Sequence, residues 1–191
     1  MKPISLSSTA LRAMAAGVAA TTAWSLAVPG GADAVPARAE TAAVAPGAGL
    51  GRLTIARMGL TSTVREGVAA RVLTRGVGHY PGTALPGRTG NAVFLGHRTS
   101  APAPFDAIDR LRKGDRVVFR SGSRSYVYRV YASRIIAPGD FSVLAPVPFE
   151  RGVRPKRAVA TLISCYPKGS SAHRIAVFAT LKPPAGRGSG R

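Results

Sequence analysis

Residues 158–169 have the sequence Ala-Val-Ala-Thr-Leu-Ile-Ser-Cys-Tyr-Pro-Lys-Gly, with the chain's single cysteine, Cys165, near their middle. Residues 158–164 are mostly apolar or β-branched, which is typical of a buried strand. Proline cannot continue a central strand, so Pro167 predicts that the strand ends at or near Cys165. Strand ends and the loops that follow them are where rigid scaffolds present reactive groups.

A lone cysteine has two interpretations. A free cysteine is often a small, buried and inert hydrophobic residue. It is a candidate nucleophile when it lies in a partly exposed loop position, and the strand-to-loop position of Cys165 favours this second interpretation. The residues at the start of the chain strengthen it, because they predict export, and an unpaired thiol outside the cell is open to oxidation.

The export prediction rests on residues 1–34. Lys2 and Arg12 precede an uncharged apolar stretch at 13–28, and residues 32–34, Ala-Asp-Ala, fit a signal-peptidase site. The apolar stretch is somewhat short for a spanning helix, which needs about 20 residues. We therefore predict a signal peptide or N-terminal membrane anchor at 1–34. The protein is expected at the extracytoplasmic face of the membrane or in the cell wall, anchored or secreted.

The remainder of the chain divides by composition. We predict an Ala/Pro/Gly linker at 35–50, one compact domain at 51–181 and a disordered basic tail at 182–191. Period-two patterns predict six strands within the domain, and helical patterns are short and confined to 68–73 and 105–111. The strands are predicted at 53–58, 91–96, 115–120, 124–136, 157–164 and 174–181. Such a chain is mainly β, and these residues are compatible with a small barrel or sandwich.

The charge balance is strongly basic. The chain has 27 Lys and Arg residues against 8 Asp and Glu, a formal net charge of +19. Such a protein is drawn to polyanions, which include nucleic acid, anionic lipid and acidic cell-wall polymers. Charge alone does not choose among these partners.

A cysteine nucleophile needs a proton-transfer partner and a group that stabilises an oxyanion. His97 follows the predicted strand 91–96, so it shares the strand-end setting of Cys165 and is the better partner. His79 and His173 are interpreted as surface or hydrogen-bonded residues. Arg174 opens the last predicted strand, and its fork of donors suits a bound substrate or an oxyanion.

Three segments, in this order, resemble the His, Cys and Arg motifs of the sortase family: Leu95-Gly96-His97-Arg98, Thr161-Leu162-Ile163-Ser164-Cys165-Tyr166-Pro167 and His173-Arg174-Ile175-Ala176-Val177. Residues 78–87 and 105–115 also look like sortases. The resemblance extends from about Leu53 to Leu181 and is greatest to the class E type of high-GC Gram-positive bacteria.

The resemblance implies a closed eight-stranded β-barrel with one or two short helices, and a cell-surface cysteine transpeptidase of the thiol-protease type. Cys165 would attack the Thr–Gly carbonyl of a Leu-Pro-x-Thr-Gly or Leu-Ala-x-Thr-Gly sorting signal and form a thioester. His97 would protonate the departing amine and later deprotonate the incoming one, while Arg174 would steady the oxyanion and the bound signal.

The partners implied are surface proteins with a C-terminal sorting signal, and an amine acceptor such as a peptidoglycan precursor or a pilin lysine. An anionic membrane or wall surface is a further expected partner, whereas binding to a specific nucleic acid is not expected. No cofactor is expected, and no metal, because the chain lacks an acidic cluster like the calcium site of some sortases.

A snug groove over the thioester would keep water from hydrolysing it. We predict Phe94, Ser164 and Tyr166 as substrate-binding residues, with the loop 101–105 as a further wall. Ser164 stands where many sortases carry threonine, and Tyr166 where related class E sequences often have histidine.

Two alternatives remain. One is another extracellular cell-wall cysteine peptidase or transpeptidase. The L,D-transpeptidases place their cysteine in a Ser-His-Gly-Cys context that is absent here, and papain-like hydrolases place it well before the histidine. The other is a non-catalytic basic wall-binding β-module, which explains the charge but not the lone thiol.

Overall fold

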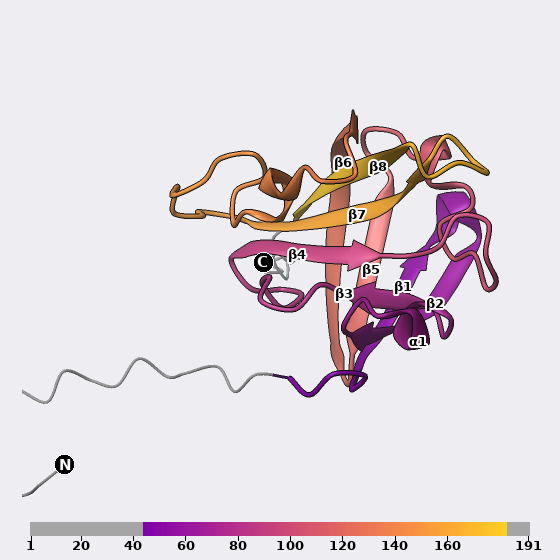
Figure 1. Cartoon of the computed structure of the whole chain (residues 1–191). Helices are drawn as coiled ribbons and strands as arrows, with labels where there is room; N and C mark the ends of the chain where they lie inside the picture. The colour runs from indigo at the N-terminus through magenta and orange to yellow at the C-terminus, as the bar shows by residue number, and fades with distance from the viewer. Residues whose placement is uncertain (1–43, 183–191) are drawn as a thin grey trace, which may run out of the picture. The chain divides into compact units, whose positions relative to one another are not determined.

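Strands make up most of the computed structural model, which describes residues 44–182 (Figure 1). The eight strands are β1 Gly49–Ile55, β2 Leu60–Glu66, β3 Val77–His79, β4 Gly90–Leu95, β5 Arg116–Ser121, β6 Arg124–Ile136, β7 Ala158–Tyr166 and β8 His173–Leu181. The single α-helix of the described part is α1, Ala70–Leu73, and the 3-10 turns are η1 Ala56–Met58, η2 Ile108–Arg110 and η3 Phe141–Leu144.

The strands close into a barrel in the order β1-β2-β3-β4-β7-β8-β6-β5, with β5 pairing back to β1. Most neighbours are antiparallel, but β2 pairs with β3 and β4 pairs with β7 in parallel. The eight-stranded barrel with few helices, expected from the resemblance, is confirmed. The parallel β4/β7 pair matters for function, because parallel strands bring their carboxyl ends to the same end of the barrel.

All six predicted strands are present, and two strands were missed. In β2 most side chains are only partly buried and three are Thr or Ser, so its apolar signal is weak. The other, β3, has only three residues. The strand predicted at 53–58 ends at Ile55 instead, because Gly59 takes a left-handed conformation (φ 63°) that closes η1.

Domain limits differ slightly from prediction. Strand β1 begins at Gly49, so the predicted linker 35–50 extends too far by two residues. The predictions for residues 1–34 and 35–43 lie outside the described residues, as does the predicted tail beyond 182. Within residues 44–182, no helix has the length and apolar character needed to span a membrane.

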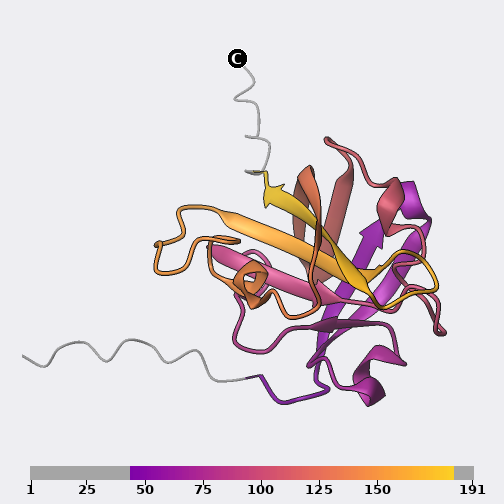
Figure 2. The same cartoon turned by 45° about the horizontal axis from the view of Figure 1, so that its top comes forward.

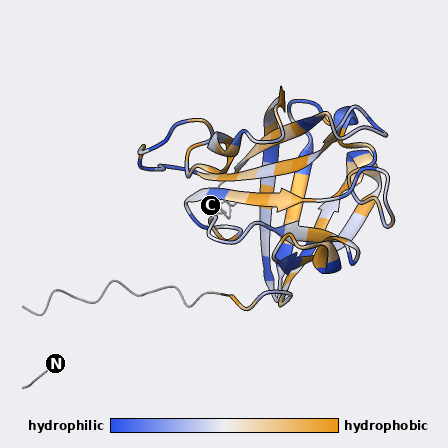
Figure 3. Ribbon diagram, in the orientation of Figure 1, coloured by the Kyte–Doolittle hydropathy of each residue, from blue (hydrophilic) through white to orange (hydrophobic). Residues whose placement is uncertain are grey.

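The core has two parts. Inward-facing side chains from all around the barrel, among them Leu53, Phe94 and Tyr128, form the larger cluster. A smaller cluster lies on the outer face of β4, β7 and β8 and includes Val143 of η3. The connection from β6 to β7 covers this outer face, and it forms the loop that projects at the left in Figures 1 and 2. In Figure 3 many apolar residues lie on the strands of the barrel, whereas the tip of this projecting loop is hydrophilic.

Candidate active site

The carboxyl ends of β4 and β7 lie side by side and are tied together. Their parallel register runs as far as Leu95 opposite Ile163. Two further bonds extend it: the amide of Gly96 donates to the carbonyl of Ile163 (3.3 Å), and the Ser164 hydroxyl donates to the carbonyl of Gly96 (2.8 Å). If this one-to-one register continued for two more residues, His97 would be opposite Cys165.

Strand β8 flanks Cys165 on the other side. Cys165 and Arg174 are directly opposed in the antiparallel β7/β8 pair. Opposed residues point to the same face of a sheet, with Cβ atoms roughly 4.5–5.5 Å apart. Because β4, β7 and β8 are neighbours, Cys165 and Arg174 lie opposite each other on β7 and β8, and His97 lies two residues past the end of β4 on the other side of β7. The thiol of Cys165 is free and the residue is half-buried, so a ligand can reach it.

A close approach of chain segments fixes the position of His97. A Cβ atom on Gly96 would lie only 2.8 Å from the ring of Phe105 and 2.9 Å from Pro104. Glycine therefore lets the loop 99–107 pack directly on the end of β4. The amide of Phe105 then donates to the carbonyl of His97 (3.0 Å), which holds the His97 backbone against this loop.

Arg98 is a residue of the site to which the sequence assigned no role. It is only 3% exposed, although it carries a permanent charge. Its guanidinium forms an ion pair with Asp109 (Nη2–Oδ2, 2.8 Å) and donates to the carbonyls of Cys165 (3.3 Å) and Asp106 (3.4 Å). It also lies over the ring of Tyr166, 5.6 Å from the centroid. Arg98 therefore joins the end of β7 to the loop that follows His97.

The guanidinium of Arg174 is held by the loop between β7 and β8. Its Nη1 donates to the carbonyls of Ser171 (2.8 Å) and His173 (2.9 Å). An arginine has five N–H donors. The other three have no protein partner among the described residues, so they are available to a ligand.

Two of the three substrate-contact predictions are wrong. Phe94 is fully buried in the core, where it packs against the rings of His79 and Phe119. Ser164 is 3% exposed, and its hydroxyl is engaged by Gly96. Alternation along a strand explains both errors, because the residues next to an outward-facing position point inward. Tyr166 is half-buried beside Cys165 and stays a candidate for substrate contact.

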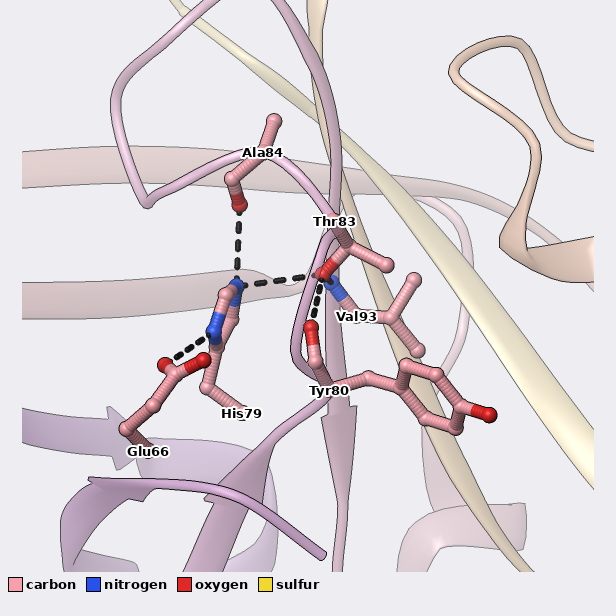
Figure 4. A network of polar contacts seen from close by, with 6 residues as sticks. All are labelled: Glu66, His79, Tyr80, Thr83, Ala84 and Val93. Carbon is pink, nitrogen blue, oxygen red and sulfur yellow. Dashed lines mark hydrogen bonds and ion pairs between the residues drawn. The ribbon is translucent and has the colours of Figure 1, made fainter. Parts of the chain in front are cut away.

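His79 lies in a buried polar network rather than at the surface (Figure 4). It is 1% exposed; its Nδ1 lies 2.6 Å from Oε2 of Glu66, and its Nε2 lies 3.0 Å from the carbonyl of Ala84. The Thr83 hydroxyl near Nε2 donates to the carbonyl of Tyr80, so it offers Nε2 an acceptor. Both ring nitrogens thus have hydrogen-bond partners, and Nδ1 faces the Glu66 carboxyl. His79 is therefore a buried, hydrogen-bonded residue, one of the two alternatives predicted for it.

His173 is exposed at the start of β8, as predicted. Within residues 44–182, no three His, Cys, Asp or Glu side chains gather closely enough to hold a metal ion. The candidate site therefore has a half-buried thiol directly opposite an arginine, with a histidine in the loop after the neighbouring strand, and these residue types suit nucleophilic acyl transfer.

The comparisons with known proteins agree with this arrangement. Residues 53–182 match the family model of the sortase domain. Sortase SrtE1 of Streptomyces coelicolor is 32% identical over 154 residues, which cover 76% of this chain and 44% of that protein. The chain spans about half the length of the curated Streptomyces relatives it matches.

Solved structures give the same result. Sortase E of Streptomyces avermitilis is 33% identical with a TM-score of 0.66, over 73% of this chain and 91% of that one. The sortase D5 transpeptidase of Clostridium perfringens is 26% identical with a TM-score of 0.64, over 73% and 82%. Class E proteins are among the matches, as the motifs predicted. By domain match, barrel topology and motif order, the chain belongs to the sortase family.

Proposed function

We propose that this chain is a cell-surface cysteine transpeptidase that cleaves a sorting signal between Thr and Gly and joins the new carboxyl end to an amine. The direct opposition of Cys165 and Arg174 on β7 and β8, with His97 two residues past the end of β4, carries the proposal. Membership of the sortase family supports it. The signal is of the Leu-Pro-x-Thr-Gly or Leu-Ala-x-Thr-Gly kind.

In the first step the sulfur of Cys165 attacks the carbonyl carbon of the threonine. A C–S bond forms, and the bond between this carbon and the glycine nitrogen breaks. The departing amine takes a proton from His97, and the free N–H donors of Arg174 face the oxyanion that develops meanwhile. The product of this step is a thioester at Cys165.

In the second step an amine attacks the thioester carbonyl and loses a proton to His97. The C–S bond breaks, Cys165 leaves as thiolate, and a new amide joins the two partners. A thiolate is both a good nucleophile and a good leaving group, so the exchange of amides needs no ATP. The acceptor is an amine of the cell wall, such as a peptidoglycan precursor or a pilin lysine.

We also propose an extracytoplasmic location for this chemistry. The pattern of residues 1–34 supports export, and the Ala/Pro/Gly-rich composition that follows is typical of a linker before the barrel. The domain limits that follow are a barrel from Gly49 to Leu181 and a short basic tail.

One experiment tests both steps. The full chain is incubated with a Leu-Ala-x-Thr-Gly or Leu-Pro-x-Thr-Gly peptide, together with a peptidoglycan stem peptide or a lysine-containing pilin peptide. Mass spectrometry of the products should show release of the glycine-bearing fragment and a new amide between threonine and the acceptor. Cleavage at another bond, or no cleavage of either peptide by a reduced protein, would contradict the proposal.

Arg98 is expected to act as a positioning residue. Replacing Arg98 with methionine should lower kcat at least tenfold and leave KM nearly unchanged, because displacement of reacting groups by about 1 Å can cost on the order of 100-fold. Steady-state kinetics of peptide cleavage measures both constants. Arg98→Lys should recover part of kcat, since it restores the charge near Asp109 but not the fork of donors.

Arg110 supplies the matched control, because it lies on η2 in the same region and is exposed. Arg110→Met should leave kcat and KM unchanged. If Arg98→Met lowered the unfolding temperature and kept its full kcat in the folded fraction, Arg98 would have a structural role alone.

A further inference from the structure

A row of outward-facing residues crosses four strands on the side of the barrel. Val159 of β7 is opposite Thr180 of β8, Thr180 is opposite Arg129 of β6, and Arg129 is opposite Arg116 of β5. All four are at least partly exposed, whereas the residues next to them in each strand are buried or, in the case of Leu181, partly buried against the core. With strands about 4.8 Å apart, the row is roughly 14 Å long.

Three hollows follow this row and share lining residues. The largest, about 590 Å³, lies over the start of β7 and includes Val159 and Tyr131. The second, about 340 Å³, shares Tyr131 and Thr180 with the first. The third, also about 340 Å³, shares Arg129 and Gly114 with the second. The three hollows thus adjoin one another along the row, and we call them together the cross-strand groove.

The lining of the cross-strand groove is strongly basic. The largest hollow contributes three cations, Arg154, Lys156 and Arg157. The other two contribute five more, Lys113, Lys182, Arg129, Arg116 and Arg57.

Asp115 is the one acid among the lining residues, and its charge is already matched. It accepts hydrogen bonds from the backbone amide of Arg112 (2.8 Å) and from Nε of Arg57 (3.2 Å). The hydrogen bond from Arg112 is the main cause that lowers the pKa of the Asp115 carboxyl. The other cations therefore face the groove without a lining acid to neutralise them.

The groove also offers apolar surface but little for bases to stack on. Tyr131 and Val153 in the largest hollow are 43% and 45% exposed, and three prolines line the same hollow. Tyr131 is the single aromatic residue in the lining of the three hollows. Proteins that bind single-stranded nucleic acid rely on several aromatic rings, each stacked on a base. The groove suits polyols or sugars better than bases.

The groove is separate from the candidate active site. Val159 precedes Cys165 by six residues on the same extended strand, which corresponds to about 20 Å. A ligand in the groove therefore leaves the peptide site at the other end of β7 open.

We propose that the cross-strand groove binds a linear, non-aromatic polyanion, of the kind in which phosphodiesters link polyol or sugar units. Its length and its several separate cations suit a chain of repeated anionic groups rather than one anion. Such a ligand would hold the enzyme at an anionic polymer while the peptide site works independently.

Binding of the full chain to poly(glycerol phosphate) over a range of salt concentrations tests the proposal. Arg116→Gln combined with Arg157→Gln removes one cation from each end of the groove. Each surface cation contributes about a fivefold factor to binding an anionic surface, so affinity should fall about 25-fold. The slope of the logarithm of the affinity against the logarithm of the salt concentration should become shallower by about 1.4, because each lost phosphate contact with a flexible strand contributes about 0.7.

Arg71→Gln combined with Arg75→Gln is the matched control. Both residues are exposed and lie outside the groove lining, Arg71 on the helix α1 and Arg75 two residues past its end, and the net charge lost is the same. This control should bind the polymer almost as the unchanged protein does, and both double variants should cleave a sorting peptide normally. Equal loss of affinity in the two double variants would overturn the proposal, because net charge alone would then govern binding.

Two further probes define the ligand class. A single-stranded oligonucleotide carries the same phosphodiester charge along a backbone that also bears aromatic bases. Vesicles of phosphatidylglycerol carry that charge on a lipid surface. Both are expected to bind more weakly than poly(glycerol phosphate) and to be less sensitive to the Arg116/Arg157 change. Tighter, groove-dependent binding of either probe would assign the groove to that class and overturn the proposed one. Because these measurements concern binding, their outcome is independent of whether the peptide is cleaved.

Discussion

Cys165→Ala is expected to abolish both the cleavage of a sorting peptide and its transfer to an amine, with a loss of more than about a thousandfold. Without the sulfur atom no covalent bond to the threonine carbonyl can form, and neither His97 nor Arg174 can replace it. The barrel should remain folded, because Cys165 is half-buried at a strand end and fills no part of the core. Chromatography of the cleavage products measures the loss.

Mass spectrometry of the intact protein adds a second measurement. The unchanged protein mixed with peptide and no amine should carry the mass of the acyl group, released by hydroxylamine as thioesters are. The alanine variant should carry none. Cys165→Ser keeps the size of the side chain but is a much poorer nucleophile, so it should also be inactive. Persistent cleavage by Cys165→Ala would place the nucleophile elsewhere.

His79→Leu is expected to destabilise the barrel by about 3–5 kcal/mol, the usual cost of breaking a buried ion pair from one side. The change leaves the Glu66 carboxylate, which is 5% exposed, without its partner. Chemical denaturation with urea measures the free energy of unfolding.

Two controls accompany this prediction. His173→Leu removes an exposed histidine and should change the free energy of unfolding by no more than about 0.5 kcal/mol. The double change Glu66→Leu with His79→Leu removes both charges and should recover part of the stability lost by His79→Leu alone. A double variant as unstable as the single one would show that packing, and not the unpaired carboxylate, causes the loss.

The sequence predicted the strands and residues whose signals are local. β7 has a continuous apolar run that ends at a proline, so both the strand and the position of Cys165 followed from it. His97 and Arg174 followed from their places at the ends of other predicted strands, and the motif order then identified the barrel. The opposition of Cys165 and Arg174 was not visible in the sequence, because it depends on the register between β7 and β8.

The features that were missed depend on long-range pairing. Glu66 and His79 lie at adjacent positions of the parallel β2/β3 pair, and both of these strands were absent from the prediction. His79 therefore looked like an isolated residue in a turn. Arg98 looked like one arginine among many, because its partners Asp109 and Cys165 are brought to it by the fold. The burial of the Arg98 charge beside Cys165 can be recognised only in the three-dimensional structure.

The closure of β1 onto β5 has a consequence for life outside the cell. An open sheet presents a row of unpaired amides and carbonyls to which any extended polypeptide can add as a further strand. A closed barrel removes that edge. At the proposed cell-surface location, a closed barrel would bind a peptide at the end of β7 without being joined to other extended chains by backbone pairing. Under the proposed function, selectivity for the peptide would then depend on side chains such as Tyr166 and Arg174.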